Sequence, residues 1–157
     1  MDQQTWEFDP VLIYNFIAVH LPELLYPLND WKSIHGKQGF SWRPGSVSFA
    51  TIDADGNSPL FVEIRESYSQ PISAIRVVKV PFEVGSVGVI VTETVQKWNV
   101  PIPEGYYALF FTIEPWGESW KYHLSFISTK EIPQAEIILA DELLSPPDEL
   151  LMEAEPA

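Results

Sequence analysis

The distribution of proline most constrains what this chain can fold into. Fourteen prolines are spread through 157 residues. A proline inside a helix removes a backbone hydrogen bond and clashes with the preceding turn. Long helices are therefore disfavoured in every part of the chain. The stretches between the prolines are rich in β-branched and aromatic residues, which are the residues that strands prefer. The sequence thus favours an all-β protein.

Several of these stretches alternate in the way that half-buried strands do. Ser46–Ile52 places Val47 and Phe49 on one face, and Trp120–Ile127 alternates in the same manner. Tyr106–Ile113 is a nearly unbroken apolar run, which is typical of a central strand covered on both faces. Further strands are expected at residues 11–19, 60–64, 72–80 and 87–95.

Short strands separated by turn residues predict a mainly antiparallel β-sandwich. We expect one or two short helices in addition, at residues 21–33 and 140–154. Residues 1–145 are expected to form a single β-sandwich domain. Residues 146–157 are expected to be an acidic C-terminal tail with a frayed end.

The turn residues suggest how some strands connect. Asp53-Ala54-Asp55-Gly56-Asn57 contains residues that tolerate positive φ, so it predicts a hairpin between the strands at 46–52 and 60–66. The same stretch resembles part of an EF-hand calcium loop. Thr51 and Val62 would then stand where that loop needs carboxylates, so we predict a turn and no metal site. Pro103-Glu104-Gly105 predicts a tight turn into the strand that follows.

The charge of the chain is strongly negative and unevenly placed. The formal net charge is −13, and eight acids but no lysine or arginine lie from Glu131 to the end. DNA and RNA binding relies on lysine and arginine, so direct nucleic-acid binding is disfavoured. A basic protein partner would be attracted. The alternative, that the charge serves only solubility, stays open.

Residues that could perform chemistry are sparse. There is no cysteine, and His20, His35 and His123 have no metal-ligand spacing. His123 falls on the polar face of its strand, where we expect it to be exposed. No G-x-S-x-G motif and no phosphate-binding glycine loop occurs. We therefore predict neither an enzyme nor a metal or cofactor site. The N-terminus has no secretory leader pattern and no apolar run is long enough to cross a membrane, so a cytoplasmic location is expected.

Three of the six tryptophans lie beside Pro, Gly, Asp or Arg in stretches that we interpret as loops: Trp31, Trp42 and Trp116. Aromatic and arginine side chains in loops are favoured at binding hot spots. Trp42 and Arg43 belong to the stretch Gln38–Phe49, which we interpret as a structured loop entering a strand, with recognition as a second possible role.

Several stretches, taken in order, resemble the competence protein J family of bacterial nuclease inhibitors: Pro27-Leu28-Asn29-Asp30-Trp31, Gln38-Gly39-Phe40 with Gly45-Ser46-Val47-Ser48-Phe49, Val77–Val84, and Ile102–Leu109. They cover roughly residues 10–115. The resemblance implies a protein that binds and inhibits a metal-dependent, non-specific DNA-entry nuclease and has no catalytic residues of its own.

An acidic protein can occupy the basic cleft of such a nuclease, and a carboxylate can approach its metal, because Mg²⁺ prefers oxygen ligands. The predicted partner-binding residues are the loop acids and their neighbouring aromatics and arginine: Asp30, Trp31, Trp42, Arg43, Asp53, Asp55, Glu114, Trp116 and Glu118. Two other functions stay open, a carbohydrate-binding β-sandwich with exposed tryptophans and an acidic protein-interaction domain. The sequence gives no indication of the oligomeric state.

Overall fold

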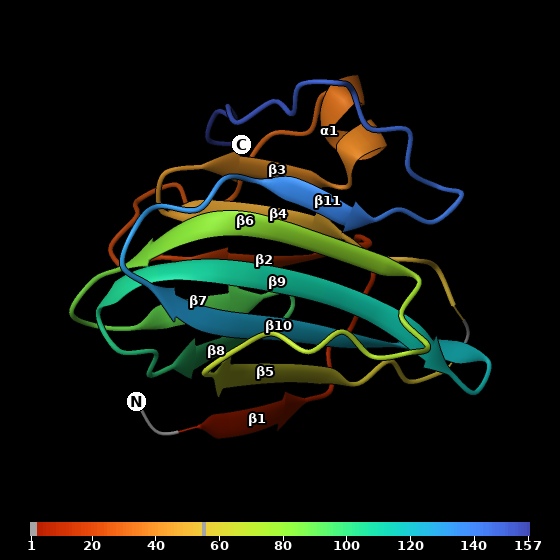
Figure 1. Cartoon of the computed structure of the whole chain (residues 1–157), viewed down its shortest axis with the longest axis horizontal. Coiled ribbons are helices and arrows are strands. Elements are labelled where there is room, and N and C mark those ends of the chain that lie inside the picture. The colour runs from red at the N-terminus through yellow and green to blue at the C-terminus, as the bar shows by residue number, and fades with distance from the viewer. Residues whose placement is uncertain (1–2, 55) are drawn as a thin grey trace. The chain divides into compact units, whose positions relative to one another are not determined.

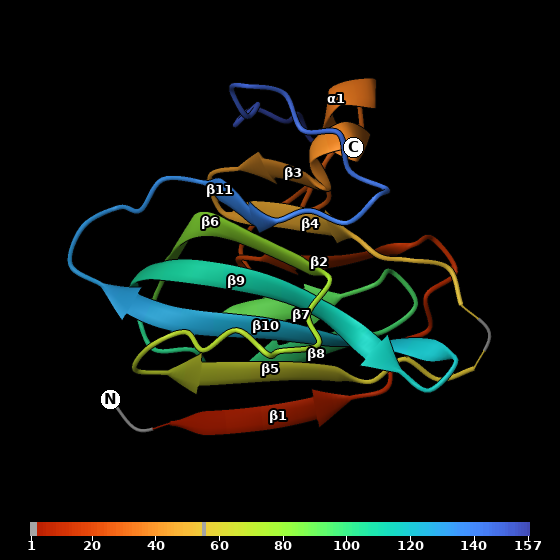
Figure 2. The ribbon, with the colours of Figure 1, turned by 45° about the vertical axis from the view of Figure 1, so that its right-hand side comes forward.

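The computed structural model describes residues 3–54 and 56–157, which form two β-sheets and one short helix. Figures 1 and 2 show the strands of each sheet side by side. The chain is divided into two compact units. Unit 1 contains Met1–Pro10, Ile52–Phe82 and Tyr106–Asp141, and unit 2 contains Val11–Thr51, Glu83–Gly105 and Glu142–Ala157. The prediction of an all-β, mainly antiparallel protein with a short helix is confirmed.

The first sheet has six strands, in the order β1 (Gln4–Phe8), β5 (Leu60–Arg65), β10 (Ser119–Thr129), β9 (Gly105–Trp116), β6 (Arg76–Val84) and β11 (Glu136–Leu139). β1 runs antiparallel to β5, and β9 antiparallel to β10. β5 and β10 are parallel, with Leu60 opposite Tyr122 and Ile64 opposite Phe126. A parallel pair needs a long connection between its strands, and here more than fifty residues separate them.

The second sheet has five strands, in the order β3 (Phe40–Arg43), β4 (Ser46–Ala50), β2 (Phe16–His20), β7 (Val89–Thr92) and β8 (Lys97–Val100). The pairings described between its neighbours are antiparallel. The helix α1 (Ser33–Gln38) precedes β3, and Gly39 ends it in the left-handed conformation at φ +84°. Glycine adopts this conformation at low cost.

The apolar run at the centre of the first sheet is β9, as predicted. Its residues from Tyr107 to Ile113 are all buried. On one face Phe111 stacks on Tyr122, with ring centroids 5.8 Å apart. On the other face Tyr68, from the connection between β5 and β6, stacks on Phe110 at 4.1 Å. Both faces of the strand are therefore covered.

Several connections differ from the predictions. No hairpin joins residues 46–52 to 60–66, because β4 pairs with β2 and β3 whereas β5 pairs with β1 and β10. The hairpin that does form joins β3 to β4 through Pro44 and Gly45. The strand expected at residues 11–19 is confined to β2, and β1 was not predicted.

The two predicted helices, at residues 21–33 and 140–154, do not form. Only α1 is helical among the described residues, and it begins where the first predicted helix was expected to end. Pro22 and Pro27 interrupt the first segment, and Pro146 and Pro147 interrupt the second. The backbone groups of both segments instead bond to distant parts of unit 2, for example Leu21 N–H to the Gly45 carbonyl oxygen at 2.9 Å and Ser145 N–H to that of Lys37 at 2.9 Å.

Residues 142–157, which we call the C-terminal segment, contact other parts of unit 2 at several points up to Ala157. Leu144 is buried and packs on Gly39, where an added Cβ would lie 3.0 Å from its Cδ2 atom. Gln38, fully buried on α1, donates to the carbonyl oxygen of Leu151 at 2.9 Å and accepts from the Leu151 N–H at 2.9 Å. In both views the C-terminal segment runs beside α1 (Figures 1 and 2).

In unit 1, a buried ion pair joins the start of β6 to the residues that follow β11. The Arg76 guanidinium donates to both carboxylate oxygens of Asp141, at 2.6 and 3.0 Å, and the Arg76 and Asp141 side chains are only 2% and 8% exposed. Removing one partner of a buried ion pair lowers stability more than replacing both partners with apolar residues, because the charge that remains is buried without a partner.

We therefore expect Asp141→Ala to lower the free energy of unfolding by about 3–5 kcal/mol in urea denaturation. The double variant R76M/D141L leaves no buried charge. Its free energy of unfolding is therefore expected to fall by less than that of Asp141→Ala. A double variant that is less stable than Asp141→Ala would contradict this account.

Candidate functional site

In unit 2, the segment of residues 21–32, which we call the 21–32 loop, is organised by the buried side chain of Asn29. The Asn29 amide nitrogen donates to the carbonyl oxygens of Ser41 at 2.8 Å and Ser46 at 3.1 Å. The amide oxygen accepts a hydrogen bond from Arg43 Nε at 2.7 Å. Both amide protons and the oxygen are thus used, and the loop is joined to β3 and β4.

Three side chains of the β3–β4 hairpin hold backbone carbonyl groups of the same loop. Ser41 Oγ donates to the Asp30 carbonyl oxygen at 2.7 Å, and Ser46 Oγ donates to that of Pro27 at 2.5 Å. The Arg43 guanidinium donates to the carbonyl oxygen of Tyr26. A loop with few ladder bonds is thereby fixed along its course by specific side-chain contacts.

The 21–32 loop presents large apolar side chains to solvent. Leu25 is 82% exposed, Tyr26 is 63% exposed and Trp31 is 37% exposed. The Trp31 ring meets the ring of buried His35 edge-on, with centroids 6.3 Å apart. Tyrosine and tryptophan are the residues that dominate binding hot spots.

The C-terminal segment bonds to the loop through its backbone. The Asp30 N–H donates to the Glu155 carbonyl oxygen at 2.8 Å, and the Glu155 N–H donates to the Asp30 carboxylate at 3.0 Å. The Ala157 N–H donates to the Leu28 carbonyl oxygen at 2.9 Å. This pattern resembles the addition of a strand to an exposed edge.

His35 connects three features of this surface. Its Nδ1 accepts a hydrogen bond from the Lys32 N–H at 2.9 Å. Its Nε2 therefore carries the proton and donates to the Glu153 carbonyl oxygen at 2.8 Å. The imidazole thus links the start of α1, the Trp31 ring and the C-terminal segment.

A groove of about 340 Å³ lies between β3 and the C-terminal segment. Lys32, Arg43 and Pro44 form one side, and residues 151–155 form the other. Glu153 and Glu155 are its acids, so charges of both signs line it. This balance gives the groove no clear preference for an anion or a cation.

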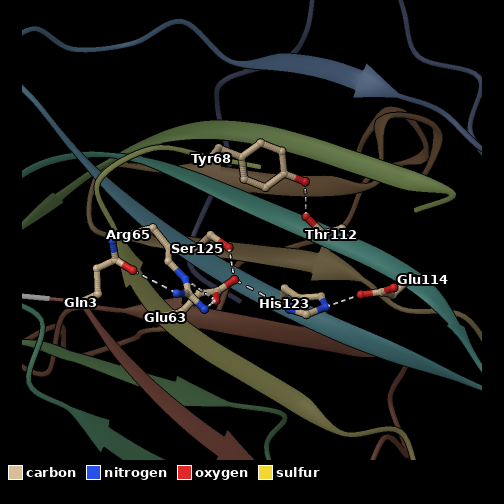
Figure 3. A network of polar contacts seen from close by, with 8 residues as sticks. All are labelled: Gln3, Glu63, Arg65, Tyr68, Thr112, Glu114, His123 and Ser125. Atoms are coloured by element: carbon tan, nitrogen blue, oxygen red, sulfur yellow. Dashed lines mark hydrogen bonds and ion pairs between the residues drawn. The ribbon is translucent and has the colours of Figure 1, made fainter. Parts of the chain in front are cut away.

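In unit 1, a second polar cluster is centred on His123 of β10 (Figure 3). His123 Nε2 lies 2.6 Å from a carboxylate oxygen of Glu114, and Nδ1 lies 3.7 Å from one of Glu63. The ring stacks on Phe61 with centroids 5.7 Å apart. Only 15% of the His123 side chain is exposed, so the prediction of an exposed histidine is wrong.

The neighbours of this cluster satisfy its carboxylates. Glu63 accepts from Ser125 Oγ and from Arg65 Nε, both at 2.8 Å. Glu114 accepts from Ser73 Oγ at 2.6 Å. Ser125 donates to a carboxylate and not to the imidazole, so the cluster lacks the nucleophile-to-base hydrogen bond of a serine hydrolase.

A pocket of about 300 Å³ opens over the cluster and is lined largely by hydroxyl-bearing and charged side chains. Among them Tyr68 and Thr112 share a hydrogen bond of 2.7 Å (Figure 3). No three histidine, aspartate or glutamate side chains in the part of the chain that the structure describes are arranged to hold a metal ion.

The pKa of Glu114 reflects opposing influences. Burial acts to raise it, but the hydrogen bonds from Ser73 and His123 and the charges of His123 and Lys121 together lower the pKa below its ordinary value. The ionised carboxylate is therefore the form that the fold stabilises.

At the turn between β9 and β10, Trp116 is 50% exposed and Glu118 is also exposed. The Lys121 ammonium lies 5.0 Å from the Trp116 ring centroid and 4.8 Å from that of Phe61. This ammonium places positive charge beside the exposed tryptophan.

The structure thus distributes the predicted site residues over both units. Asp30, Trp31, Trp42 and Arg43 lie in unit 2, and Glu114, Trp116 and Glu118 lie in unit 1. Trp42 is a half-buried residue of β3, so its assignment to a loop is wrong. Asp53 is exposed after β4, and Asp55 lies outside the described residues.

Sequence reasoning missed four features of the unit 2 surface: Leu25, Tyr26, Asn29 and the docking of residues 142–157. Leu25 and Tyr26 lie in the helix expected at residues 21–33, and residues 142–157 overlap the expected helix and tail, but none of these residues was a predicted site residue. Asn29 lies in the stretch Pro27–Trp31. Its side chain could not be recognised as a buried bridge, because asparagine in a proline-rich loop is usually a turn residue.

The family model of competence protein J (ComJ) matches residues 9–127. The chain therefore belongs to the competence protein J family. β11 and the C-terminal segment lie beyond the matched residues.

Two solved structures have a similar fold. One is ComJ from Bacillus subtilis, an inhibitor of the DNA degrading activity of NucA, with a TM-score of 0.72 and 18% identity over 82% of this chain and 100% of that chain. The other, described as crocagin biosynthetic gene J, has a TM-score of 0.59 and 11% identity over 83% of this chain and 100% of that chain. No curated protein sequence matches the chain. Among the described residues, no helix is long and apolar enough to cross a membrane.

The hydrogen bonds of Gln38 generate a prediction about the C-terminal segment. Gln38→Ala removes both bonds to Leu151 and a third to the Phe40 carbonyl oxygen at 3.0 Å. We expect the free energy of unfolding to fall by about 1–3 kcal/mol. The amide hydrogen of Leu151 is expected to exchange faster. Gln134→Ala is the matched control, because Gln134 is exposed, and equal exchange rates in both variants would refute the docking role of Gln38.

The lowered pKa of Glu114 generates a prediction about pH. A depressed pKa in the folded state contributes stability above the unfolded pKa, and this contribution is lost as the pH falls through the folded value. Glu114→Gln is expected to cost about 1–3 kcal/mol at neutral pH, with the difference from wild type shrinking below about pH 4. Denaturation at several pH values measures this. The control Glu118→Gln changes an exposed carboxylate and is expected to have little effect.

Proposed function

We propose that this protein is an inhibitor of a metal-dependent, non-specific DNA nuclease and that it acts by covering the basic surface with which the nuclease binds DNA. The observation that carries the proposal is membership of the competence protein J family over residues 9–127. The fold is shared with ComJ from Bacillus subtilis, an inhibitor of the DNA degrading activity of NucA.

Electrostatics supports this mode of action. A nuclease that grips the DNA backbone without regard to sequence does so with lysine and arginine side chains. A protein with a formal net charge of −13 is attracted to such a surface and steered towards it over distances of about 10 Å at moderate salt. The same charge repels DNA. The inhibitor therefore binds the nuclease in place of DNA and does not bind the DNA itself.

Carboxylates near the exposed aromatics can also approach the metal of the nuclease, because Mg²⁺ takes oxygen ligands and keeps some of its sites occupied by water. Asp30 in unit 2 and Asp53, Glu114 and Glu118 in unit 1 stay candidates for this role. Glu114 is the weakest of these, because its carboxylate already accepts hydrogen bonds from Ser73 and His123.

The carbohydrate-binding alternative gains no support from the tryptophans. Such a protein would present a row of them on one sheet face. In the described part of the chain the exposed tryptophans are Trp31 and Trp116, and they belong to different units. A cytoplasmic location and a basic partner stay predictions.

The proposed function is tested by adding the purified protein to a DNA-degrading nuclease encoded in the same genome. We expect cleavage to stop at a stoichiometric ratio and the inhibition to weaken as salt rises from about 50 mM to about 300 mM, since screening shortens the range of charge attraction. Inhibition that does not depend on salt would overturn the electrostatic part of the proposal. No inhibition of any such nuclease would overturn the function itself.

A further inference from the structure

We infer that the partner docks on the outer side of the 21–32 loop, where Leu25, Tyr26 and Trp31 form its apolar contact. The surface that fits there is an apolar patch bordered by lysine or arginine on the nuclease. This inference rests on the proposed function and assigns to it a particular surface of unit 2.

The first argument is the exposure of these side chains. Leu25, Tyr26 and Trp31 come from one short loop and are 82%, 63% and 37% exposed. Their full burial against a partner would remove several large apolar groups from water at once. Aromatic anchors of this kind supply most of the binding energy in protein complexes.

The second argument is the rigidity of the loop that carries them. The Asn29 amide, the hydroxyls of Ser41 and Ser46, and the Arg43 guanidinium hold the loop from the side of β3 and β4. The C-terminal segment holds it through the backbone of Leu28 and Asp30. A loop already fixed before binding loses little conformational entropy in the complex.

The third argument is charge. The bond between the Glu155 N–H and the Asp30 carboxylate places the acids of the C-terminal segment beside the loop. Glu153 reaches the same surface, since its carbonyl oxygen binds the His35 ring that Trp31 contacts. The Arg43 guanidinium is turned to the Tyr26 carbonyl oxygen and the Asn29 amide. Lys32 and Arg43 lie on the same surface, so it is the formal net charge of −13 together with these acids that favours a basic partner.

The exposed tryptophan of unit 1 fits a basic partner less well. The Lys121 ammonium lies 5.0 Å from the Trp116 ring centroid and already occupies the region that a partner lysine or arginine would approach. Glu114, close by on the same strand, has its carboxylate engaged with Ser73 and His123. Like charges placed together oppose binding, so Trp116 serves as the matched comparison for Trp31.

The test measures the inhibition constant of full-length variants against the nuclease that the wild type inhibits. Tyr26→Ala removes an exposed ring and leaves the carbonyl group that Arg43 binds. We expect this variant and Leu25→Ala/Trp31→Ala to weaken inhibition at least about tenfold, as hot-spot truncations do. Trp116→Ala is expected to stay within about twofold of wild type. Tyr26→Phe keeps the ring and should retain inhibition, which separates a contact from a fault in folding.

A second set of variants tests whether Glu153 and Glu155, beside the 21–32 loop, attract the partner. Glu153→Gln/Glu155→Gln and the control Glu7→Gln/Asp9→Asn change the net charge equally, and all four residues are exposed. The first pair is expected to lower the association rate and to flatten its salt dependence more than the control. Equal effects of the two pairs would show that only the total charge matters, and would overturn the role of Glu153 and Glu155.

The outcomes separate the inference from the proposed function. If the wild type inhibits while Tyr26→Ala and Leu25→Ala/Trp31→Ala inhibit as well as it does, the function stands and the assignment to the 21–32 loop is wrong. If only Trp116→Ala loses inhibition, the contact with the partner lies in unit 1. If the wild type inhibits no nuclease, the function and the assignment fall together.

Discussion

The side-chain amide of Asn29 is the interaction on which the proposed partner-binding surface of unit 2 depends. A buried amide that lost its partners would cost about 1–3 kcal/mol for each unsatisfied group. Here both donors and the acceptor are used, and they reach Ser41, Ser46 and Arg43 on two neighbouring strands. The loop can therefore follow only one course over β3 and β4. That course places Leu25 and Tyr26 in solvent and Asp30 within reach of the C-terminal segment.

The C-terminal segment lies beyond the residues that the family model matches. The whole of the ComJ chain from Bacillus subtilis is covered by 82% of this chain, and the family model ends at residue 127. After residue 127 come β11 and the segment that docks on α1. The Gln38 side-chain amide pairs with the Leu151 backbone as a neighbouring strand would. It offers one donor and one acceptor, as a peptide group does. The extension thus brings further acids to unit 2 without a hydrophobic core of its own.

Those parts of the fold that depend on local composition could be predicted from the sequence. The prolines excluded long helices, and the apolar run of β9 identified a central strand. Alternation, however, reports which face a residue takes and not which strand it pairs with. The Asp53–Asn57 turn was therefore assigned to a hairpin, although β4 and β5 belong to different sheets. The partner of β5 lies at Ser119–Thr129, and no local pattern identifies a parallel neighbour so far along the chain.

The candidate site shows the same limit. Asp30, Trp31, Trp42 and Arg43 were singled out by residue type, and the fold brings their segments together. The type of a residue does not reveal where its side chain points. The Arg43 side chain bonds to Asn29 and Tyr26 within unit 2, and the Glu114 carboxylate bonds to Ser73 and His123. Leu25 and Tyr26 lie in residues 21–33, where a short helix was expected, so an exposed loop position was not predicted for them. Their exposure could be seen only once the course of the loop was known.

The parallel pairing of β5 with β10 has a consequence for synthesis on the ribosome. β1 and β5 can associate once Arg65 has emerged, but β10 is complete only at Thr129. At roughly 5–20 residues per second, one edge of β5 waits for about three to thirteen seconds. An unpaired strand edge that persists for seconds invites association with other nascent chains. Slow translation or a shortage of chaperones should therefore reduce the yield of this protein more than that of a β-protein built from consecutive hairpins.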